Sequence, residues 1–391
     1  MTVNHETLPC EIWLQIFFHL DTRTYSVSYS PFQPLPGVAS EGHVCSAYST
    51  VVLVCRNWRA WAVELLYRNI KLSDRSPLQE ALDHRRGYGR WVRRAVVPYS
   101  TTATETCKPM PSTEILGLCP NLEVLVRPPY ALYPMQTLRF EFDATCPSLA
   151  SLKRLDWWNH MEAARSGGIN SLTAVLAVAP NIEYLFIGAT QFRFTMVPQH
   201  GLSGAPIKLP HLRTLRLNIL NALLLHHIVY RWDLPALDNL VLDSPLVGAG
   251  NDVLWEVLGP RLDVVEFGRH VRFLLDQHLV PCLRGCPKLR ELNYYLFAMA
   301  PPEMEPGESF PSVSSIKIQM SGTTFLDGEK EECAHFERHF DIFTGGIFPN
   351  LRRLLIFGMR QSVLKDARFI AMQKRLSDRG CILEFLDKSG F

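Results

Sequence analysis

The sequence predicts a mixed α/β fold, in which a small all-α region over residues 1–72 precedes an array of strand–helix repeats over residues 73–391. Two segments, 8–20 and 49–71, carry apolar residues at helical spacing but on more than one face. After them, a motif of Pro, any residue and then Leu, Ile or Val recurs nine times, at intervals of 24 to 38 residues. Because helical spacing precedes several of these prolines, each repeat predicts a helix followed by a short parallel strand.

The composition narrows the classes of function. The chain has 391 residues, 47% of them apolar, and a formal net charge of +2, which does not favour a nucleic-acid partner. Its ten cysteines form no paired C-x-x-C motifs, so we expect reduced thiols and a cytoplasmic or nuclear protein. We see no signal peptide and no window of about 18 apolar residues, and therefore expect no membrane partner.

The first helix is predicted from LPCEIWLQIFFHL at residues 8–20. Pro9 suits the first helical position, and Glu11 complements the helix dipole in the first turn. The apolar residues that follow point all round the helix, whereas a surface helix of an ordinary domain has one apolar stripe.

The second apolar segment, 49–71, predicts one helix, because Val51, Val54, Trp58 and Leu65 recur at three- and four-residue spacing. Two helices as short and as apolar as these make a unit too small to be stable alone. We infer that they cover each other on one side and bind a second protein on the other.

These residues resemble the F-box, and most closely the F-box proteins of mushroom-type (basidiomycete) fungi. The pattern L-P-x-E-I-x-x-x-I-F-x-x-L at 8–20 is followed by V-C-R-x-W-R at 54–59 and by L-L-Y-R at 65–68. The resemblance implies a substrate-recognition subunit of an SCF-type cullin-RING ubiquitin ligase, a non-catalytic receptor in ubiquitin-dependent protein degradation. It also implies that the box binds the SCF adaptor protein, and through it cullin, with Leu8, Pro9, Ile12, Ile16, Leu20, Val54, Cys55 and Trp58.

An insertion at residues 21–48 separates the two halves of the box. It is rich in Ser, Pro and Gly and has no regular period, so we expect an exposed or disordered segment. Such a loop costs little stability if it only bulges outward.

The remaining chain has the pattern of an irregular leucine-rich-repeat solenoid, a horseshoe with parallel strands on its concave face. In LPHLRTLRL at 209–217, Leu215 and Leu217 are predicted to point into the core, and Thr214 and Arg216 to line the concave face. The same alternation in other repeats gives candidate residues for binding a target protein, namely Tyr184, Phe186, Arg216, Asn293, Tyr295 and Arg353.

Both ends of such an array need capping elements. RWVRRAVV at 90–97 predicts the first strand. At the other end, the sequence predicts a helix over 361–379, Gly380 as its C-cap and a last strand over 381–386.

The sequence offers little catalytic chemistry. His335 and His339 lie four residues apart, a spacing that can bind a metal, but Phe336 stands where the zinc-protease motif has Glu. We expect both histidines on the solvated face of their helix and no metal. We find no nucleophile motif and no phosphate-binding loop, and so expect no enzymatic activity and no cofactor.

Two other functions stay open. The insertion motivates a leucine-rich-repeat scaffold for protein interactions whose F-box is non-functional. The histidine pair motivates an enzyme with a metal-dependent site in one of the irregular loops.

Overall fold

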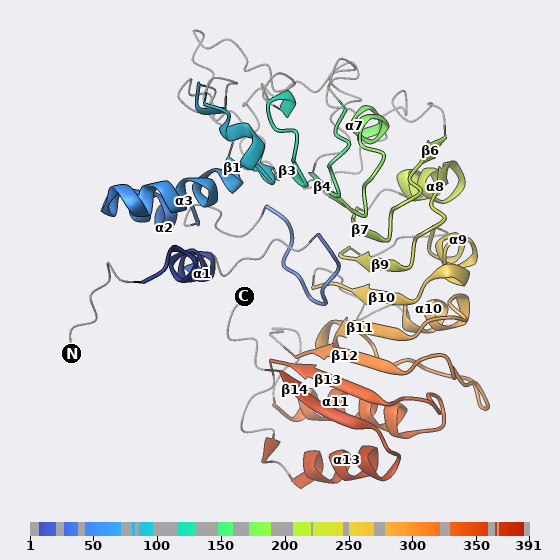
Figure 1. Cartoon of the computed structure of the whole chain (residues 1–391). Coiled ribbons are helices and arrows are strands. Elements are labelled where there is room, and N and C mark those ends of the chain that lie inside the picture. Colours follow the sequence, from blue (N-terminus) through green and yellow to red (C-terminus); the bar gives the residue numbers. More distant parts are fainter. Residues whose placement is uncertain are drawn as a thin grey trace, which may run out of the picture. The chain divides into compact units, whose positions relative to one another are not determined.

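The computed structural model of the chain describes residues 8–20, 27–37, 44–71, 80–82, 86–96, 116–129, 148–158, 172–188, 206–219, 222–244, 250–269, 278–320, 329–358, 364–365 and 367–386 (Figure 1). The chain divides into two compact units, Met1–Ser28 with Leu35–His211 and Tyr29–Pro34 with Leu212–Phe391. The domain boundary expected at 72–73 falls inside the first unit, and it stays a prediction.

Three helices begin the first unit: α1 (Cys10–Leu20), α2 (Val44–Val54) and α3 (Arg56–Arg68). The prediction of one helix over 49–71 is wrong, because Cys55 interrupts the helix and separates α2 from α3. The extended backbone of Cys55 (φ −157°, ψ 170°) brings its sulfur to cap α3, where it accepts a hydrogen bond of 3.4 Å from the Trp58 amide.

The strands of the first unit are all parallel and pair in the order β1 (Asn69–Lys71), β2 (Arg94–Val96), β3 (Val124–Arg127), β4 (Arg154–Trp158) and β5 (Tyr184–Gly188). The unit also contains η2 (Tyr88–Trp91), α7 (Leu172–Val178) and β6 (Ile207–Lys208). The segment 90–97 is therefore not the first strand, as predicted. Residues 90–96 contribute the end of a 3-10 helix and then the second strand, and residue 97 lies outside the described residues.

The second unit has a parallel strand order of β7 (Thr214–Asn218), β9 (Asn239–Leu242), β10 (Val264–Phe267), β11 (Glu291–Tyr295), β12 (Ser315–Gln319), β13 (Arg353–Phe357) and β14 (Ile382–Leu386). Its other elements are α8 (Ala222–Arg231), β8 (Trp232–Asp233), α9 (Gly250–Val257), η3 (Gly259–Arg261), α10 (Leu279–Gly285), η4 (Leu296–Ala298), α11 (Glu329–Thr344) and α13 (Ala367–Asp378). Helices α9 and α10 lie along one side of these strands (Figure 1).

The strands pair at one equivalent position of each repeat. Thr214 pairs with Asn239, Asn239 with Val264, and Val264 with Glu291. The next position along each strand is a buried apolar residue, and these stack into one ladder of Leu215, Leu240, Val265, Leu292, Ile316 and Leu354. The predicted α/β class with a parallel sheet is confirmed. Leu212, Leu215 and Leu217 are buried as predicted, but Thr214 and Arg216, which were expected to face outward, are buried as well.

At the end of the array, a helix, a glycine C-cap and a last strand follow in the predicted order. Of the helix predicted over 361–379, α13 covers Ala367–Asp378, and residues 361–363 and 366 lie outside the described residues. Helix α13 ends at Asp378, Gly380 adopts the left-handed conformation of a helix C-cap (φ +75°), and β14 follows as the last strand.

Candidate functional site

Helix α1 packs one face against α2 and α3. The rings of Trp13 and Phe17 lie 4.6 and 5.1 Å from the ring of Trp58, centroid to centroid. The hydroxyl of Tyr48 donates a hydrogen bond of 3.1 Å to the Phe17 carbonyl, which fixes α1 along α2. A small apolar core therefore holds the three helices together.

The other faces of these helices expose large apolar side chains. Of the twelve large apolar residues that are exposed in the described part of the chain, seven belong to α1 and to the end of α2. We call them the apolar helix surface: Ile12, Leu14, Ile16, Phe18, Leu20, Leu53 and Val54. Leu53 is 83% exposed, so nothing in the described chain covers it. Exposed apolar patches of this kind mark interaction sites.

Most of the residues predicted to bind the adaptor are accessible. Ile12, Ile16, Leu20 and Val54 are part of the apolar helix surface. Of the remaining four, Pro9 and Cys55 are exposed, whereas Leu8 and Trp58 are half-buried. Trp58 differs from the others, because its ring belongs to the contact between the helices.

The insertion does not behave as the sequence predicts. Residues 27–37, in its middle, pack against the strands, while 21–26 and 38–43 lie outside the described residues, and Val44–Tyr48 belong to α2. Tyr29–Pro34, part of the second unit, runs beside the strands of that unit and is blue in Figure 1. We call it the 29–34 segment.

Tyr29 makes the first contact of this segment. Its hydroxyl donates a hydrogen bond of 2.6 Å to Oε2 of Glu266 on β10 and accepts one of 2.6 Å from the amide of Asn293 on β11. The side chains of both strand residues are buried. Burial also raises the pKa of the Tyr29 hydroxyl, which favours the neutral, donating form.

Phe32 makes the second contact. Its amide donates to both carboxylate oxygens of Glu266, at 3.1 and 3.0 Å. Its ring lies 5.3 Å from the rings of both Tyr295 and Phe357, edge to face. Phe32 has a φ of +56°, in the left-handed region that a bulky residue adopts only under constraint.

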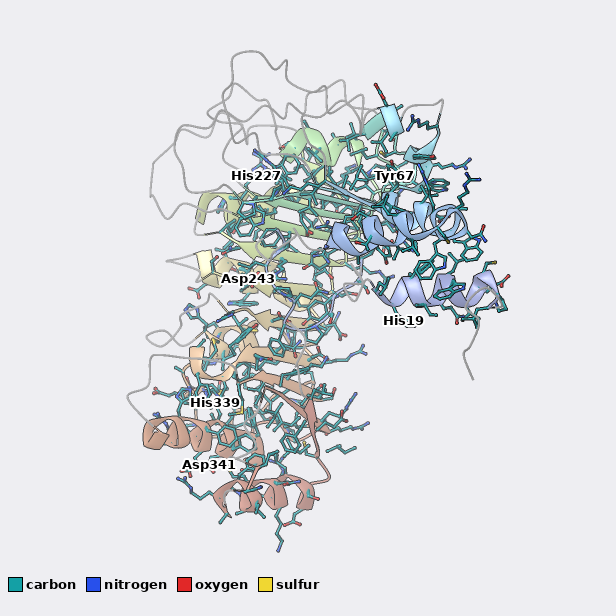
Figure 2. The ribbon with its side chains drawn as sticks, turned by 90° about the vertical axis from the view of Figure 1, so that its left-hand side faces the viewer. His19, Tyr67, His227, Asp243, His339 and Asp341 are labelled. Carbon is teal, nitrogen blue, oxygen red and sulfur yellow. The ribbon has the colours of Figure 1, made fainter. Side chains whose placement is uncertain are left out.

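Arg216 on β7 makes the third contact, and it binds backbone atoms. Its guanidinium donates to the carbonyl oxygens of Gln33, at 2.9 Å, and Pro34, at 3.2 Å. The same group pairs with Asp243, which directly follows β9 and is labelled in Figure 2. The buried ion pair fixes the direction in which Arg216 points.

The carboxylate of Glu266 lies among these three contacts. Its pKa is raised from 4.5 to about 7, chiefly by burial and to a smaller extent by the nearby charge of Asp243. The charge of Arg216 and the hydrogen bonds from Tyr29 and Phe32 act in the opposite direction.

Residues 35–37 of the insertion pack within the first unit. Leu35 lies against the buried cluster of Trp158, Tyr184 and Phe186, and the indole nitrogen of Trp158 donates a hydrogen bond of 2.7 Å to the carbonyl of Pro36. Tyr184 and Phe186 were predicted to bind a target. In this structure their side chains are buried.

The other four predicted target-binding residues belong to the second unit. Arg216, Asn293 and Tyr295 all contact the 29–34 segment. Arg353 is exposed and pairs with Glu384 at 3.1 Å. Sequence reasoning placed these residues on the strands but missed that the insertion packs on them. The signal was the pair of aromatic residues and the prolines in YSPFQP at 29–34.

The prediction that His335 and His339 lie on the solvated face of their helix is wrong. His335 and His339 on α11 are buried, not solvated, because α11 packs over η4 and the residue that follows it. Nε2 of His335 lies 3.0 Å from the Leu296 carbonyl, and Nε2 of His339 lies 3.2 Å from that of Met299. In the part of the chain that the structure describes, no three His, Cys, Asp or Glu residues gather as a metal site would require.

His339 uses both of its ring nitrogens. Since Nε2 must donate to a carbonyl, Nδ1 is left to accept from the hydroxyl of Tyr294, at 3.0 Å. Burial lowers the pKa of His339, which is labelled in Figure 2, to about 3, so the ring stays neutral.

Among the helices in the described part of the chain, none has the length and apolar character that a membrane crossing needs. No family model matches the sequence, and no curated protein is significantly similar to it.

Proposed function

We propose that this chain is the substrate-recognition subunit of an SCF-type ubiquitin ligase. Helices α1–α3 act as the F-box that binds the adaptor, and the repeats bind the target protein. The observation that carries the proposal is the apolar helix surface, which lies where the F-box pattern of the sequence predicts contact with the adaptor.

The energetics of this surface support a protein partner. Ile12 and Ile16 lie one turn apart on α1, at about 40% exposure each, although the helix already buries Phe17 on its other side. Burial in an interface is worth roughly 25 cal/mol for each Å² of apolar surface removed from water. A groove that takes such a helix face is a common mode of recognition.

In this function the chain performs no chemistry of its own. It holds a target close to the ubiquitin carrier that the ligase complex recruits, and so raises the effective concentration of the target's lysines. Neither a metal nor a cofactor is needed for that role.

The test is co-expression with an SCF adaptor from a mushroom-forming fungus, followed by purification on this chain and measurement of the mass of the complex. We expect a one-to-one complex for the wild type and none for the double variant Ile12→Asp with Ile16→Asp. Ile370→Asp, on α13, is the matched control, because Ile370 is also an exposed apolar helix residue. Trp58→Ala is unsuitable, since it removes a ring from the helix core.

One observation favours the alternative of a scaffold with a non-functional F-box. The insertion within the box contacts the strand surface, where a receptor would be expected to bind its target. A wild-type chain that is folded and monodisperse, but that binds no adaptor, would support this alternative over the receptor.

A further inference from the structure

The strand surface of the second unit has the chemistry of a peptide-binding site. It offers a buried carboxylate (Glu266), a buried amide (Asn293), a fixed guanidinium (Arg216) and two aromatic rings (Tyr295 and Phe357). Together these groups bind a short piece of chain through hydroxyl, amide and carbonyl groups and one aromatic ring. Apolar contacts with a few well-placed polar groups are typical of ligand sites.

Within the described residues, the hydrogen bonds to the Glu266 carboxylate come from Tyr29 and Phe32. A buried carboxylate without donors is costly, so this residue requires a ligand of the kind that the 29–34 segment supplies. Any other peptide that occupied the surface would have to donate to Glu266 in the same place.

Each contact selects one feature of the bound chain. Glu266 and Asn293 select an unmodified tyrosine hydroxyl, since a phosphate there would face the carboxylates of Glu266 and Glu291. Tyr295 and Phe357 select an aromatic ring three residues later. Arg216 binds carbonyl groups, which every peptide has, and so selects no particular side chain.

The 29–34 segment is a strained occupant of this surface. Pro31 and Phe32 lie in a turn, and the φ of Phe32, +56°, is in the left-handed region. Glycine or asparagine usually adopts that conformation. The strain opposes docking, and a peptide that presents its aromatic ring without that turn does not carry this cost.

We propose that the strand surface around Glu266 is a recognition site for a peptide segment of another protein, with a tyrosine and, three residues later, an aromatic residue, and that the 29–34 segment is a built-in competitor that this peptide must displace. The binding of such a peptide does not depend on the F-box. Identifying it as part of a ubiquitylation target does rest on the proposed function.

The experiment measures binding of the fluorescent peptide VSYSPFQPLPG, the sequence of residues 27–37, to the full chain by anisotropy, without adaptor. Three proteins are compared: the wild type, the double variant Tyr29→Ala with Phe32→Ala, and the control Ser30→Ala, whose exposed side chain lies between the two docked residues. We expect the double variant to bind the peptide at least 10-fold more tightly than the other two, because a tethered competitor acts at a local concentration of about millimolar.

Two modified peptides test the assigned contacts. A peptide with phosphotyrosine at the position of Tyr29, and one with alanine at that of Phe32, should each bind the double variant at least 10-fold more weakly. Equal binding of all three peptides, or equal binding of the unmodified peptide by all three proteins, would overturn the proposal. So would the absence of binding to a double variant that is folded by circular dichroism.

If the double variant does not fold, hydrogen exchange on the wild type replaces it. Unlabelled peptide at several millimolar should then speed exchange at the Phe32 amide, because this donor to Glu266 is released. No change in that exchange would overturn the proposal. Since no adaptor is present in these measurements, their failure is separate from failure of the proposed function.

Discussion

The carboxylate of Glu266 accepts a hydrogen bond of 2.6 Å from the hydroxyl of Tyr29, a residue 237 positions earlier in the chain. Tyr29 belongs to an insertion between the first two helices, whereas Glu266 belongs to a repeat strand. The surface of the repeats is therefore completed by a segment that the repeat pattern does not contain. The contact between Tyr29 and Glu266 makes two measurable predictions, and His339 and Gly259 each add one.

Replacing Tyr29 by Phe should weaken the docking of the 29–34 segment. The change removes a donor to Glu266 and an acceptor for Asn293 while keeping the ring. We expect the free energy of unfolding to fall by about 1–3 kcal/mol, since a buried charged group loses a hydrogen bond. Denaturant unfolding measures the change, and Ser30→Ala should leave it unaltered. An unchanged midpoint for Tyr29→Phe would show that the hydroxyl contributes nothing.

The raised pKa of Glu266 predicts a stability that depends on pH. Because its pKa is 4.5 in an exposed state and about 7 when buried, the favourable contribution is complete below pH 4.5 and is lost as the pH rises through 7. The difference in unfolding free energy between the wild type and Glu266→Gln should therefore decrease from pH 5 to pH 8. A difference that grows over this range would contradict the assignment.

The lowered pKa of His339 predicts that stability changes with pH in the opposite direction. Its pKa is lowered from 6.5 to about 3, so its contribution is present above pH 6.5 and is lost progressively as the pH falls. Between pH 6.5 and 4.5 the wild type should lose about 1.4 kcal/mol per pH unit relative to His339→Gln. Thermal unfolding at several pH values tests this, with His19→Gln as an exposed control. Parallel curves for the wild type and His339→Gln would refute it.

A close approach between two repeats predicts one sensitive glycine. A Cβ atom at Gly259 would collide with the backbone oxygen of Gly285, which is not the flexible end of a side chain. We expect Gly259→Ala to lower the free energy of unfolding by about 1–3 kcal/mol. At Gly346 a Cβ atom would meet no heavy atom within 4 Å, so Gly346→Ala serves as the control in the same denaturation series.

Much of the fold follows from local pattern. The recurring prolines locate the repeats, and the apolar positions within a unit such as 209–217 correctly predict the buried residues Leu212, Leu215 and Leu217. These predictions succeed because each depends on a period that neighbouring residues carry. The break at Cys55 was missed because the apolar spacing of 49–71 continues across it.

Other features depend on contacts distant in sequence, and no period reveals them. The 29–34 segment lacks a regular pattern, and its partners Arg216 and Glu266 lie 183 and 237 residues away. Likewise, the spacing of His335 and His339 is the same on a solvated or a buried helix face. The carbonyls of Leu296 and Met299 decide between these outcomes, because they give both rings a partner inside the core.

One regularity among the repeats was not predicted from the sequence. The asparagine that follows the proline in three repeats donates a side-chain hydrogen bond of 2.8 Å to a carbonyl of the preceding repeat: Asn121 to Arg90, Asn181 to Ala150 and Asn350 to Pro311. The sequence contains this signal as Pro-Asn, but a single sequence does not say which carbonyl the amide will meet.

The most direct test of the central claim is a calorimetric titration of the full chain with a purified SCF adaptor. The account predicts one-to-one binding by the wild type and by Ile370→Asp. It also predicts a loss of at least about 100-fold in affinity for Ile12→Asp with Ile16→Asp, because two charges would enter an apolar interface. A folded wild-type chain that takes up no adaptor, or equal affinity of all three proteins, would contradict it.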